Sequence, residues 1–404
     1  MATDEKTLYP RNSRIARWLD EPFRIFFPLG VLFGWIGVGH WLTYAIGVTA
    51  TYSCKFHGLV QVQAFMMAFA TGFLLTAVPR RTQTKSISKS EVSALAAALL
   101  ITTIAAIADL WMLSELAYAA VFLLLGQFAV RRFIGRAAGR RPPAAFVLVP
   151  IAALQGLAGA VLIAAVELQN APEWTSDLGR LMVEQGVFLC LAVGIGGLVL
   201  PLMGGASPPP DLGSSPRETQ KALIYGSAGI LIFVSLLLES VGLERAGPLL
   251  RAIVVAIGLV FGGGTWRMPG KTGVHRKLVW LSTWLMPAGL IISALWPDYR
   301  VPALHVLFIG GFSLMAFGVA THVALGHLDL EQLALGRPPA VIALGAAFIL
   351  ALLMRVGADA SESYFAHLGW AAAAWIVGSA VWLLYFGPKL MRSRDSRFHN
   401  TKVI

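Results

Sequence analysis

The chain has 404 residues, of which 57% are hydrophobic and only 13% charged, and its mean hydropathy is +0.70. Charged residues make up about half of their usual share in a soluble domain, which excludes an ordinary globular protein and predicts one that crosses a membrane many times. The two cysteines, Cys54 and Cys190, are too few for a disulfide framework or a cysteine-based zinc site.

Long apolar runs predict an all-α fold with twelve transmembrane helices. A helix needs roughly 20 mostly apolar residues to cross a bilayer, and the runs lack the alternation of barrel strands. The predicted spans are 25–47, 57–79, 92–113, 115–133, 144–166, 180–203, 222–241, 248–265, 278–296, 302–323, 339–355 and 365–387. They form one transmembrane domain over 25–387. It is preceded by a segment at 1–24 that lacks the apolar core of a signal peptide, and a basic tail follows at 388–404.

The placement of lysine and arginine orients these spans. With the N-terminus in the cytoplasm, all but six of the 32 Lys and Arg residues fall on the cytoplasmic side. The six on the outer side are Lys55, Arg180, Arg245, Arg251, Arg300 and Arg355. This bias follows the positive-inside rule and places both termini in the cytoplasm. Topology therefore accounts for the net charge of +11, and no nucleic-acid partner is expected.

Histidines mark both ends of the tenth span. His305 lies at its outer end, at the same depth as His57 at the start of the second span, whereas His322 and His327 lie at its inner end. About 26 Å along a helix separates His305 from His322, so these two cannot share a metal ion. His322 and His327 would converge if the helix ended at Gly326, which makes them candidate metal ligands at the inner end, with a structural role as the default interpretation.

His57 and His305 are the candidate ligands of a metal or a haem. Neutral imidazole is a common ligand of iron and copper, and ionisable groups within spans usually face the bundle interior. Gln61, one turn after His57, is a candidate to orient that ring. Gly310 and Gly311 follow His305 and would leave room for a flat macrocycle.

Other polar residues in the spans have simpler interpretations. His40 is expected to be neutral and hydrogen-bonded inside the bundle. The remaining histidines are expected at the headgroup level, and they are His275, His367 and His399. Glu184 is either a proton-relay carboxylate or the i,i+4 partner of Arg180. Asp109 and Glu239 lie near the outer boundary and are expected to be solvated.

Three stretches resemble hallmarks of the NnrS family of bacterial inner-membrane proteins. They read "EPFRIFFPLGVLFGWIGV", "FHGLVQVQAFMMAFATGFLLTAVPR" and "LHVLFIGGFSLMAFGVATHVALGH". The matching positions are Pro22, Phe23 and Arg24; His57, Gly72 to Ala77 and Pro79; and His305, Leu325, Gly326 and His327. The family is described as having twelve spans, containing haem and copper, and being linked to nitric oxide stress and denitrification.

The chain also departs from the family pattern. Leu59 and Val60 stand where an "HxHE" cluster would place a second histidine and a glutamate, and His322 stands near the place of a family arginine. Leu198 takes the arginine position of a "GGRxxP" signature, whose proline remains as Pro201. With one histidine left in that cluster, haem is favoured over copper at the outer site. The resemblance is least transferable at the inner end, where His322 and His327 lie.

The resemblance implies a b-type haem held by His57 and His305 in a multi-pass protein of the bacterial inner membrane. A more distant analogy is with haem–copper oxidase catalytic subunits, which hold a low-spin haem by histidines of their second and tenth spans. Spans 180–203 and 222–241 contain no histidine, so a copper-containing reducing centre is not expected. Ligation by two histidines favours electron transfer or sensing over catalysis.

The expected partners are the lipid bilayer, nitric oxide or another small gaseous ligand, and a redox partner or a second copy of the chain. Two alternatives stay open. One is a transporter of a metal ion or small solute with histidines along its pathway, which predicts a broken helix near the midplane, at 194–197 or 261–264. The other is a non-catalytic membrane subunit in which the histidines are incidental.

Overall fold

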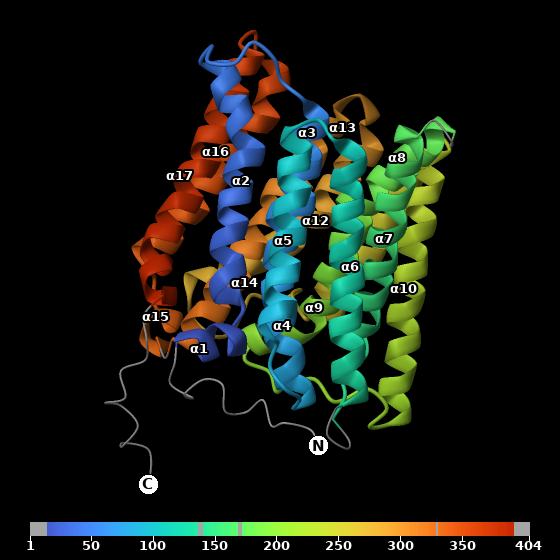
Figure 1. The fold of residues 1–404 in the computed structure, drawn as a ribbon, viewed down its shortest axis with the longest axis vertical. Coiled ribbons are helices and arrows are strands. Elements are labelled where there is room, and N and C mark those ends of the chain that lie inside the picture. The colour runs from blue at the N-terminus through green and yellow to red at the C-terminus, as the bar shows by residue number, and fades with distance from the viewer. Residues whose placement is uncertain (1–13, 136–139, 169–171, 329, 392–404) are drawn as a thin grey trace.

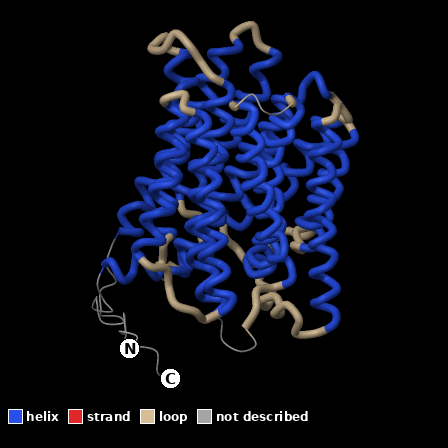
Figure 2. The backbone as a smooth tube through the Cα atoms, turned by 45° about the vertical axis from the view of Figure 1, so that its right-hand side comes forward, coloured by secondary structure: helices blue, strands red, loops and turns tan. Residues whose placement is uncertain are grey.

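Helix is the form that an apolar chain takes in a bilayer, because each backbone N–H and C=O group must find its partner within the same segment. The computed structural model describes residues 14–135, 140–168, 172–328 and 330–391, and every regular element in them is a helix. Long helices lie side by side (Figure 1), and most connecting loops gather at the two ends of the bundle (Figure 2). The predicted all-α bundle is confirmed.

The helices follow one another with short connections, and several spans change between α, π and 3-10 geometry. In chain order they are α1 (Arg14–Asp20), α2 (Phe23–Ala45), α3 (Cys54–Leu59), η2 (Val60–Met66), α4 (Met67–Thr82), α5 (Lys89–Ile107), α6 (Trp111–Ile134), η3 (Ala144–Val147), α7 (Leu148–Glu167), α8 (Glu173–Leu181), η4 (Met182–Gly186), α9 (Val187–Gly204), α10 (Pro216–Ser240), α11 (Ala246–Ala256), η5 (Ile257–Gly262), α12 (Val274–Leu295), η6 (Pro297–Tyr299), α13 (Arg300–His305), η7 (Val306–Ser313), α14 (Leu314–His327), α15 (Glu331–Leu335), α16 (Pro339–Gly357), η8 (Ala358–Ala360) and α17 (Tyr364–Met391).

Eleven continuous helices in the described residues are long and apolar enough to cross a bilayer. The span predicted at 248–265 corresponds to a shorter apolar helix, Ala246–Gly262, formed by α11 and η5. The chain is therefore a multi-pass membrane protein. Helix α2 starts at Phe23 and α17 runs to Met391, so the outermost helices extend slightly beyond the predicted bounds 25–387.

The start of the first span and the end of the last span lie together. The buried side chain of Arg24 donates from Nη1 to the carbonyl oxygen of Leu390 at 2.6 Å. In Figure 1 α1 and α15 lie at the lower end of the bundle, and α3 and α13 lie at the upper end. Since the predicted cytoplasmic arginines Arg80 and Arg81 end α4 at the lower end, the upper end is the outer one.

Three spans form the centre of the bundle. In the most apolar window of each span, the buried share of residues is 83% for Cys54–Thr82, 72% for Trp174–Gly204 and 67% for Pro297–His327. The corresponding share in the other long spans is 28% to 50%. Each of the three contains a π-helical segment, namely η2, η4 and η7. Wide π turns are rare and occur frequently at functional sites, so the centre of this bundle is where a site is expected.

A network around Glu21, which lies between α1 and α2, joins the inner ends of α2, α4 and α14. Its carboxylate accepts hydrogen bonds from Arg24 at 2.6 Å, from Arg80 at 3.0 Å and from Nδ1 of His327 at 2.9 Å. Arg80 also donates to Nε2 of His327 at 3.0 Å. Burial alone would raise the pKa of Glu21, but the His327 hydrogen bond and the charge of Arg24 lower it from 4.5 to about 2.

Replacing Glu21 with glutamine is expected to lower stability at neutral pH by up to about 3 kcal/mol, the free energy that corresponds to this pKa shift. Because the folded-state pKa is depressed, the stabilisation is fully present above the unfolded pKa of 4.5 and is lost as the pH falls towards 2. Unfolding of both proteins in detergent from pH 7 to pH 3 measures the difference. With the exposed Asp109→Asn as control, a difference that did not shrink below pH 4.5 would contradict the prediction.

Candidate functional site

A cavity of about 430 Å³ lies between the outer ends of the three central spans. His57 and Gly58 line it from the first of these spans, Glu184 from the second and His305 from the third. Four aromatic side chains form much of its apolar wall: Trp41, Phe65, Phe308 and Trp375. Residues that are about 250 positions apart in the sequence therefore share one enclosed space within the outer half of the bundle.

The two histidines predicted as ligands face this cavity together. The ring centroids of His57 and His305 are 6.2 Å apart, and the ring planes differ by only 7°. Nδ1 of His57 donates to the carbonyl oxygen of Gly37 at 2.9 Å, and Nδ1 of His305 donates to that of Val301 at 2.8 Å. Because a carbonyl can only accept, both rings carry their proton on Nδ1, which leaves the Nε2 lone pair of each ring free to bind a metal.

Both histidines sit directly before a π-helical segment. His57 belongs to α3, three residues ahead of η2, and His305 is the last residue of α13, followed at once by η7. Glu184 lies inside the third such segment, η4. A π turn holds an extra residue and so changes the direction in which neighbouring side chains point. The wide turns thus position the cavity-facing residues of all three central spans.

Close helix packing supplies the carbonyl that holds His57. A Cβ atom on Gly37 would lie 2.3 Å from Nε2 of Gln61 in the second span, and one on Gly34 would lie 2.3 Å from the Trp375 ring of α17, so glycine lets α2 approach both of these helices. The amide of Gln61 donates to the carbonyl oxygen of Gly34 at 2.8 Å. Gln61 was predicted to orient His57, but the structure gives that contact to the Gly37 carbonyl.

The spacing of the two rings suits one metal centre between them. Imidazole nitrogens bind a metal ion at about 2 Å, so two ligands on opposite sides have nitrogens about 4 Å and ring centroids about 6 Å apart. The observed 6.2 Å between the centroids of His57 and His305 agrees with this. Within the described residues, no group of three or more His, Cys, Asp and Glu side chains could hold a metal ion. The pair therefore offers two imidazole nitrogens to a metal or to a cofactor.

Arginines stand at the rim of the cavity. Arg355 is buried, lies 5.9 Å from the Tyr364 ring centroid and pairs with Asp359 at 2.8 Å. Arg180 pairs with Glu184 at 3.4 Å, as one of the two interpretations of Glu184 predicted. These cations give the outer mouth of the cavity groups that can pair with the carboxylates of a ligand.

Glu239 was predicted to be solvated near the outer boundary, and this prediction is wrong. Its side chain is buried, forms an ion pair with the fully buried Arg251, and accepts from Nε and Nη2 of Arg300 at 2.9 and 2.6 Å. Glu239 and Arg300 both line the cavity. Two arginines surround one carboxylate because burying either charge alone is far more costly than burying the pair.

The inner histidines belong to two separate clusters. Helix α14 continues through Gly326 to His327, so the helix end that would let His322 and His327 converge is not there. His322 instead lies beside His275, with 3.3 Å between its Nδ1 and Nε2 of His275. His275 was predicted at the headgroup level, but it is fully buried. Both ring nitrogens of His327 are used by Glu21 and Arg80, so we propose no metal site at the inner end.

The two glycines after His305 have a packing role that differs from the predicted one. A Cβ on Gly310 would lie 2.8 Å from the Leu285 side chain, and one on Gly311 would lie 2.5 Å from that of Met286. Neither glycine lines the histidine cavity. They let η7 approach α12, whereas Gly58 is the glycine that adjoins the cavity, next to the Glu184 carboxylate.

The remaining predicted positions are less informative. His40 is half-buried and donates from Nδ1 to the Gly37 carbonyl, as expected for a neutral histidine within the bundle. His367 is near the outer end and bonds to the carbonyl oxygen of Ser363, the residue just before α17. Asp109 is exposed, as predicted. His399 lies outside the described residues.

Sequence interpretation missed a buried carboxylate next to the site. Glu115 is fully buried, and the amide nitrogen of Gln63 lies 2.9 and 2.8 Å from its two oxygens. The predicted fourth span began at Glu115, so this residue was placed at the boundary, whereas α6 begins at Trp111 and carries it into the membrane. An acidic residue one turn inside an apolar run is the signal that could have identified it.

The fold and the cavity together define a multi-pass helical membrane protein with a bis-histidine cavity in its outer half. The sequence profile described as "NnrS protein" matches residues 17–394, which is nearly the whole chain. The chain therefore belongs to the NnrS family. No curated protein matches it.

Proposed function

We propose that the chain is a membrane haem protein that holds one b-type haem in the outer cavity, with His57 and His305 as axial ligands. The observation that carries the proposal is the near-parallel pair of imidazoles, 6.2 Å apart, each with its Nδ1 proton given to a backbone carbonyl. Fixing Nδ1 in this way orients the ring and raises the basicity of the other nitrogen.

The other residues of the cavity support this assignment by their chemistry. The aromatic wall, with Phe65, Phe308 and Trp375, suits the faces and edges of a macrocycle and excludes water. Arg180, Arg300 and Arg355 line the cavity and could pair with the two propionates of a b-type haem by sharing or exchanging their present partners Glu184, Glu239 and Asp359. No group of three protein ligands is available in the described residues, so we do not propose copper at this site.

A haem with two histidine ligands supplies one-electron redox chemistry. We therefore propose electron transfer or sensing rather than turnover of a substrate. The family resemblance extends the proposal to nitric oxide as a ligand that competes with His57 or His305, and to the bacterial inner membrane as the location. The orientation of His57 depends on the Gly37 carbonyl of another helix. The orientation of His305 depends on the Val301 carbonyl, one turn earlier in the same helix.

The transporter alternative receives less support. It predicted an unwound segment at 194–197 or 261–264, but Gly194 and Gly197 lie within the continuous helix α9, and the second run only ends η5. The central spans have wide turns rather than the broken helices that expose backbone groups to a substrate.

Absorption spectroscopy of the purified protein tests the proposal. Protein produced with ample haem supply is expected to show a Soret band in the oxidised state and the sharp visible bands of six-coordinate low-spin haem after reduction with dithionite. Extraction and quantification are expected to give one haem per chain. A folded but colourless protein would contradict the proposal.

A further inference from the structure

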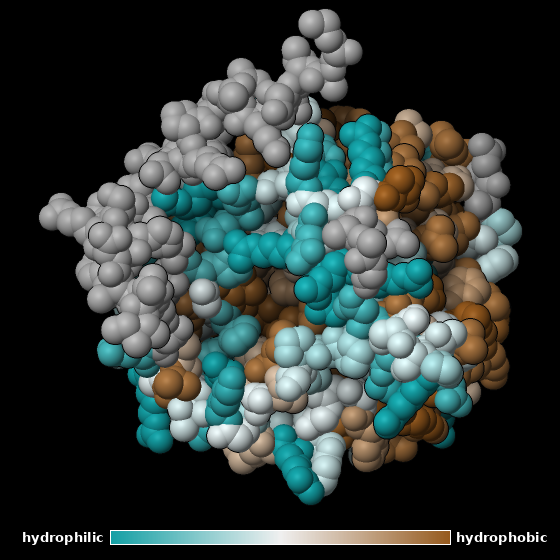
Figure 3. All heavy atoms as spheres, turned by 90° about the horizontal axis from the view of Figure 1, so that it is seen from below, coloured by the Kyte–Doolittle hydropathy of each residue, from teal (hydrophilic) through white to brown (hydrophobic). Residues whose placement is uncertain are grey.

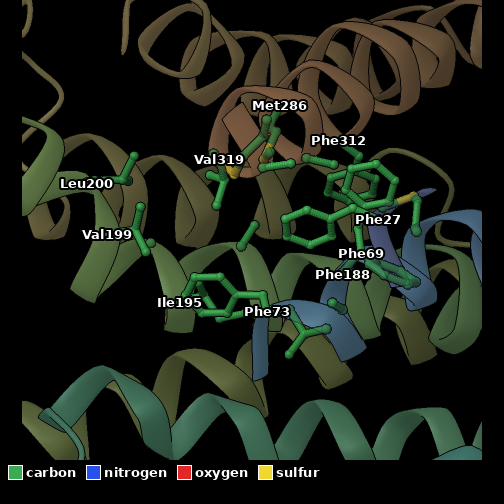
Figure 4. A pocket seen from close by; sticks show the side chains of 18 residues that line it. Phe27, Phe69, Phe73, Phe188, Ile195, Val199, Leu200, Met286, Phe312 and Val319 are labelled. Atoms are coloured by element: carbon green, nitrogen blue, oxygen red, sulfur yellow. The ribbon is translucent and has the colours of Figure 1, made fainter. Parts of the chain in front are cut away.

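A second cavity lies deeper in the bundle and differs sharply from the first. It has a volume of about 100 Å³ and lies among α2, the second and sixth spans, α12 and the tenth span. Figure 4 shows aromatic rings, among them Phe27, Phe69 and Phe312, at one end and aliphatic side chains, among them Val199 and Leu200, at the other. Every lining residue is Phe, Met, Leu, Ile, Val, Ala or Gly, so no lining side chain forms a conventional hydrogen bond.

The lining composition decides what this apolar cavity can hold. The cavity is partly open, and its walls do not offer the two to four polar partners that an ordered water needs, whereas apolar spaces of this size class take up xenon or benzene. A charged or hydrogen-bonding solute would lose its hydration without replacement. Seen from below, the inner face has a hollow near its middle, with hydrophobic atoms at depth and hydrophilic ones at the rim (Figure 3).

The apolar cavity adjoins the histidine cavity. Met66 lines both of them. Two aromatic contacts also cross the boundary, since Phe65 and Phe308 line the histidine cavity while their ring partners Phe69 and Phe312 line the apolar one, at centroid distances of 5.2 and 6.0 Å. Met66 is thus the one side chain common to both linings, and two ring pairs lie across the same boundary. Methionine adapts its shape readily, so such a wall can admit a small molecule without moving a helix.

We propose that the apolar cavity is a docking site for an uncharged apolar molecule of monatomic or diatomic size, which reaches the histidine cavity past Met66. The docking site stands on the cavity itself and needs no haem. Only the purpose of the passage, delivery to a centre held by His57 and His305, rests on the proposed function. The lining offers such a molecule apolar contacts alone.

Xenon identifies such a site directly. Crystals of the full chain under xenon pressure are expected to show an anomalous peak among Phe69, Ala192 and Ala316, with or without bound haem. Ala192→Leu, and separately Ala316→Leu, are expected to abolish the peak, because each puts a larger side chain on the cavity wall. Ala346→Leu on the exposed face of α16 is the matched control and is expected to leave the peak unchanged.

A separate variant tests the passage between the apolar cavity and the histidine cavity. Met66→Ala removes the side chain shared by both cavities and is expected to extend the xenon density towards His57 and His305. Absence of xenon from the folded wild-type protein would overturn the docking site, and an ordered acyl or detergent chain in the cavity would replace it with a lipid site. If xenon stayed confined to the apolar cavity in the Met66→Ala protein, the passage would be overturned. Since none of these results depends on haem, they are distinguishable from failure of the proposed function.

Discussion

Replacing His57 or His305 with alanine is expected to reduce bound haem at least tenfold and to abolish the six-coordinate low-spin spectrum. Either change removes one of the two histidine nitrogens, and because no group of three His, Cys, Asp and Glu side chains in the described residues could hold a metal ion, the other ligand is left alone. Haem per chain, measured by extraction, and the reduced spectrum after purification in the same detergent give the two readouts.

His367→Ala is the matched control, because it removes an imidazole near the outer end whose Nδ1 bonds to the Ser363 carbonyl just before α17. It is expected to keep the wild-type haem content. Added imidazole is expected to restore the low-spin spectrum of the His57→Ala protein by taking the vacated position, a result that separates ligation from a purely structural role. The proposed pair is falsified if both alanine variants fold and retain full haem.

Replacing Glu239 with alanine is expected to destabilise the protein by about 3–5 kcal/mol, because it leaves the fully buried guanidinium of Arg251 without its carboxylate. Arg300 loses the same partner, but its side chain is 40% exposed and can be solvated. Thermal or denaturant unfolding in detergent gives the size of the effect.

Two further variants serve as controls for the Glu239→Ala prediction. Glu244→Ala changes an exposed carboxylate that lines the same cavity, and it is expected to leave stability within about 0.5 kcal/mol of wild type. A double replacement, Glu239→Leu with Arg251→Met, removes both buried charges and is expected to recover most of the loss. If the double variant were as unstable as Glu239→Ala, the unpaired Arg251 charge could not be the cause.

Much of the fold could be predicted because span formation is a local property. The length and apolar content of each run decide whether it crosses the bilayer, and the count of lysine and arginine decides its direction. Prediction was weakest where a span is short or ends in polar residues. Ala246–Gly262 has only the length of a marginal span, and the start of α6 at Trp111 moved Glu115 from the predicted boundary into the membrane.

The candidate site was predictable only in part. Equal depth in the second and tenth spans was enough to pair His57 with His305, because depth follows from position along a helix. The atoms that orient these rings were not predictable. Gln61 has the right spacing to contact His57, but the π-helical η2 and the glycines of α2 direct it to the Gly34 carbonyl and leave His57 to Gly37.

The sequence by itself therefore determined the class of protein, its orientation in the membrane and the two histidines most worth testing. The tertiary structure decided which polar groups meet. Arg251 lies within an apolar run and Glu239 at the end of another, and only helix packing shows that they neutralise each other. The same holds for His275, buried beside His322, and for the apolar cavity below Met66. The physical reason is that hydropathy and charge bias act along one helix, whereas ion pairs, ring orientation and cavities depend on which faces of different helices come together.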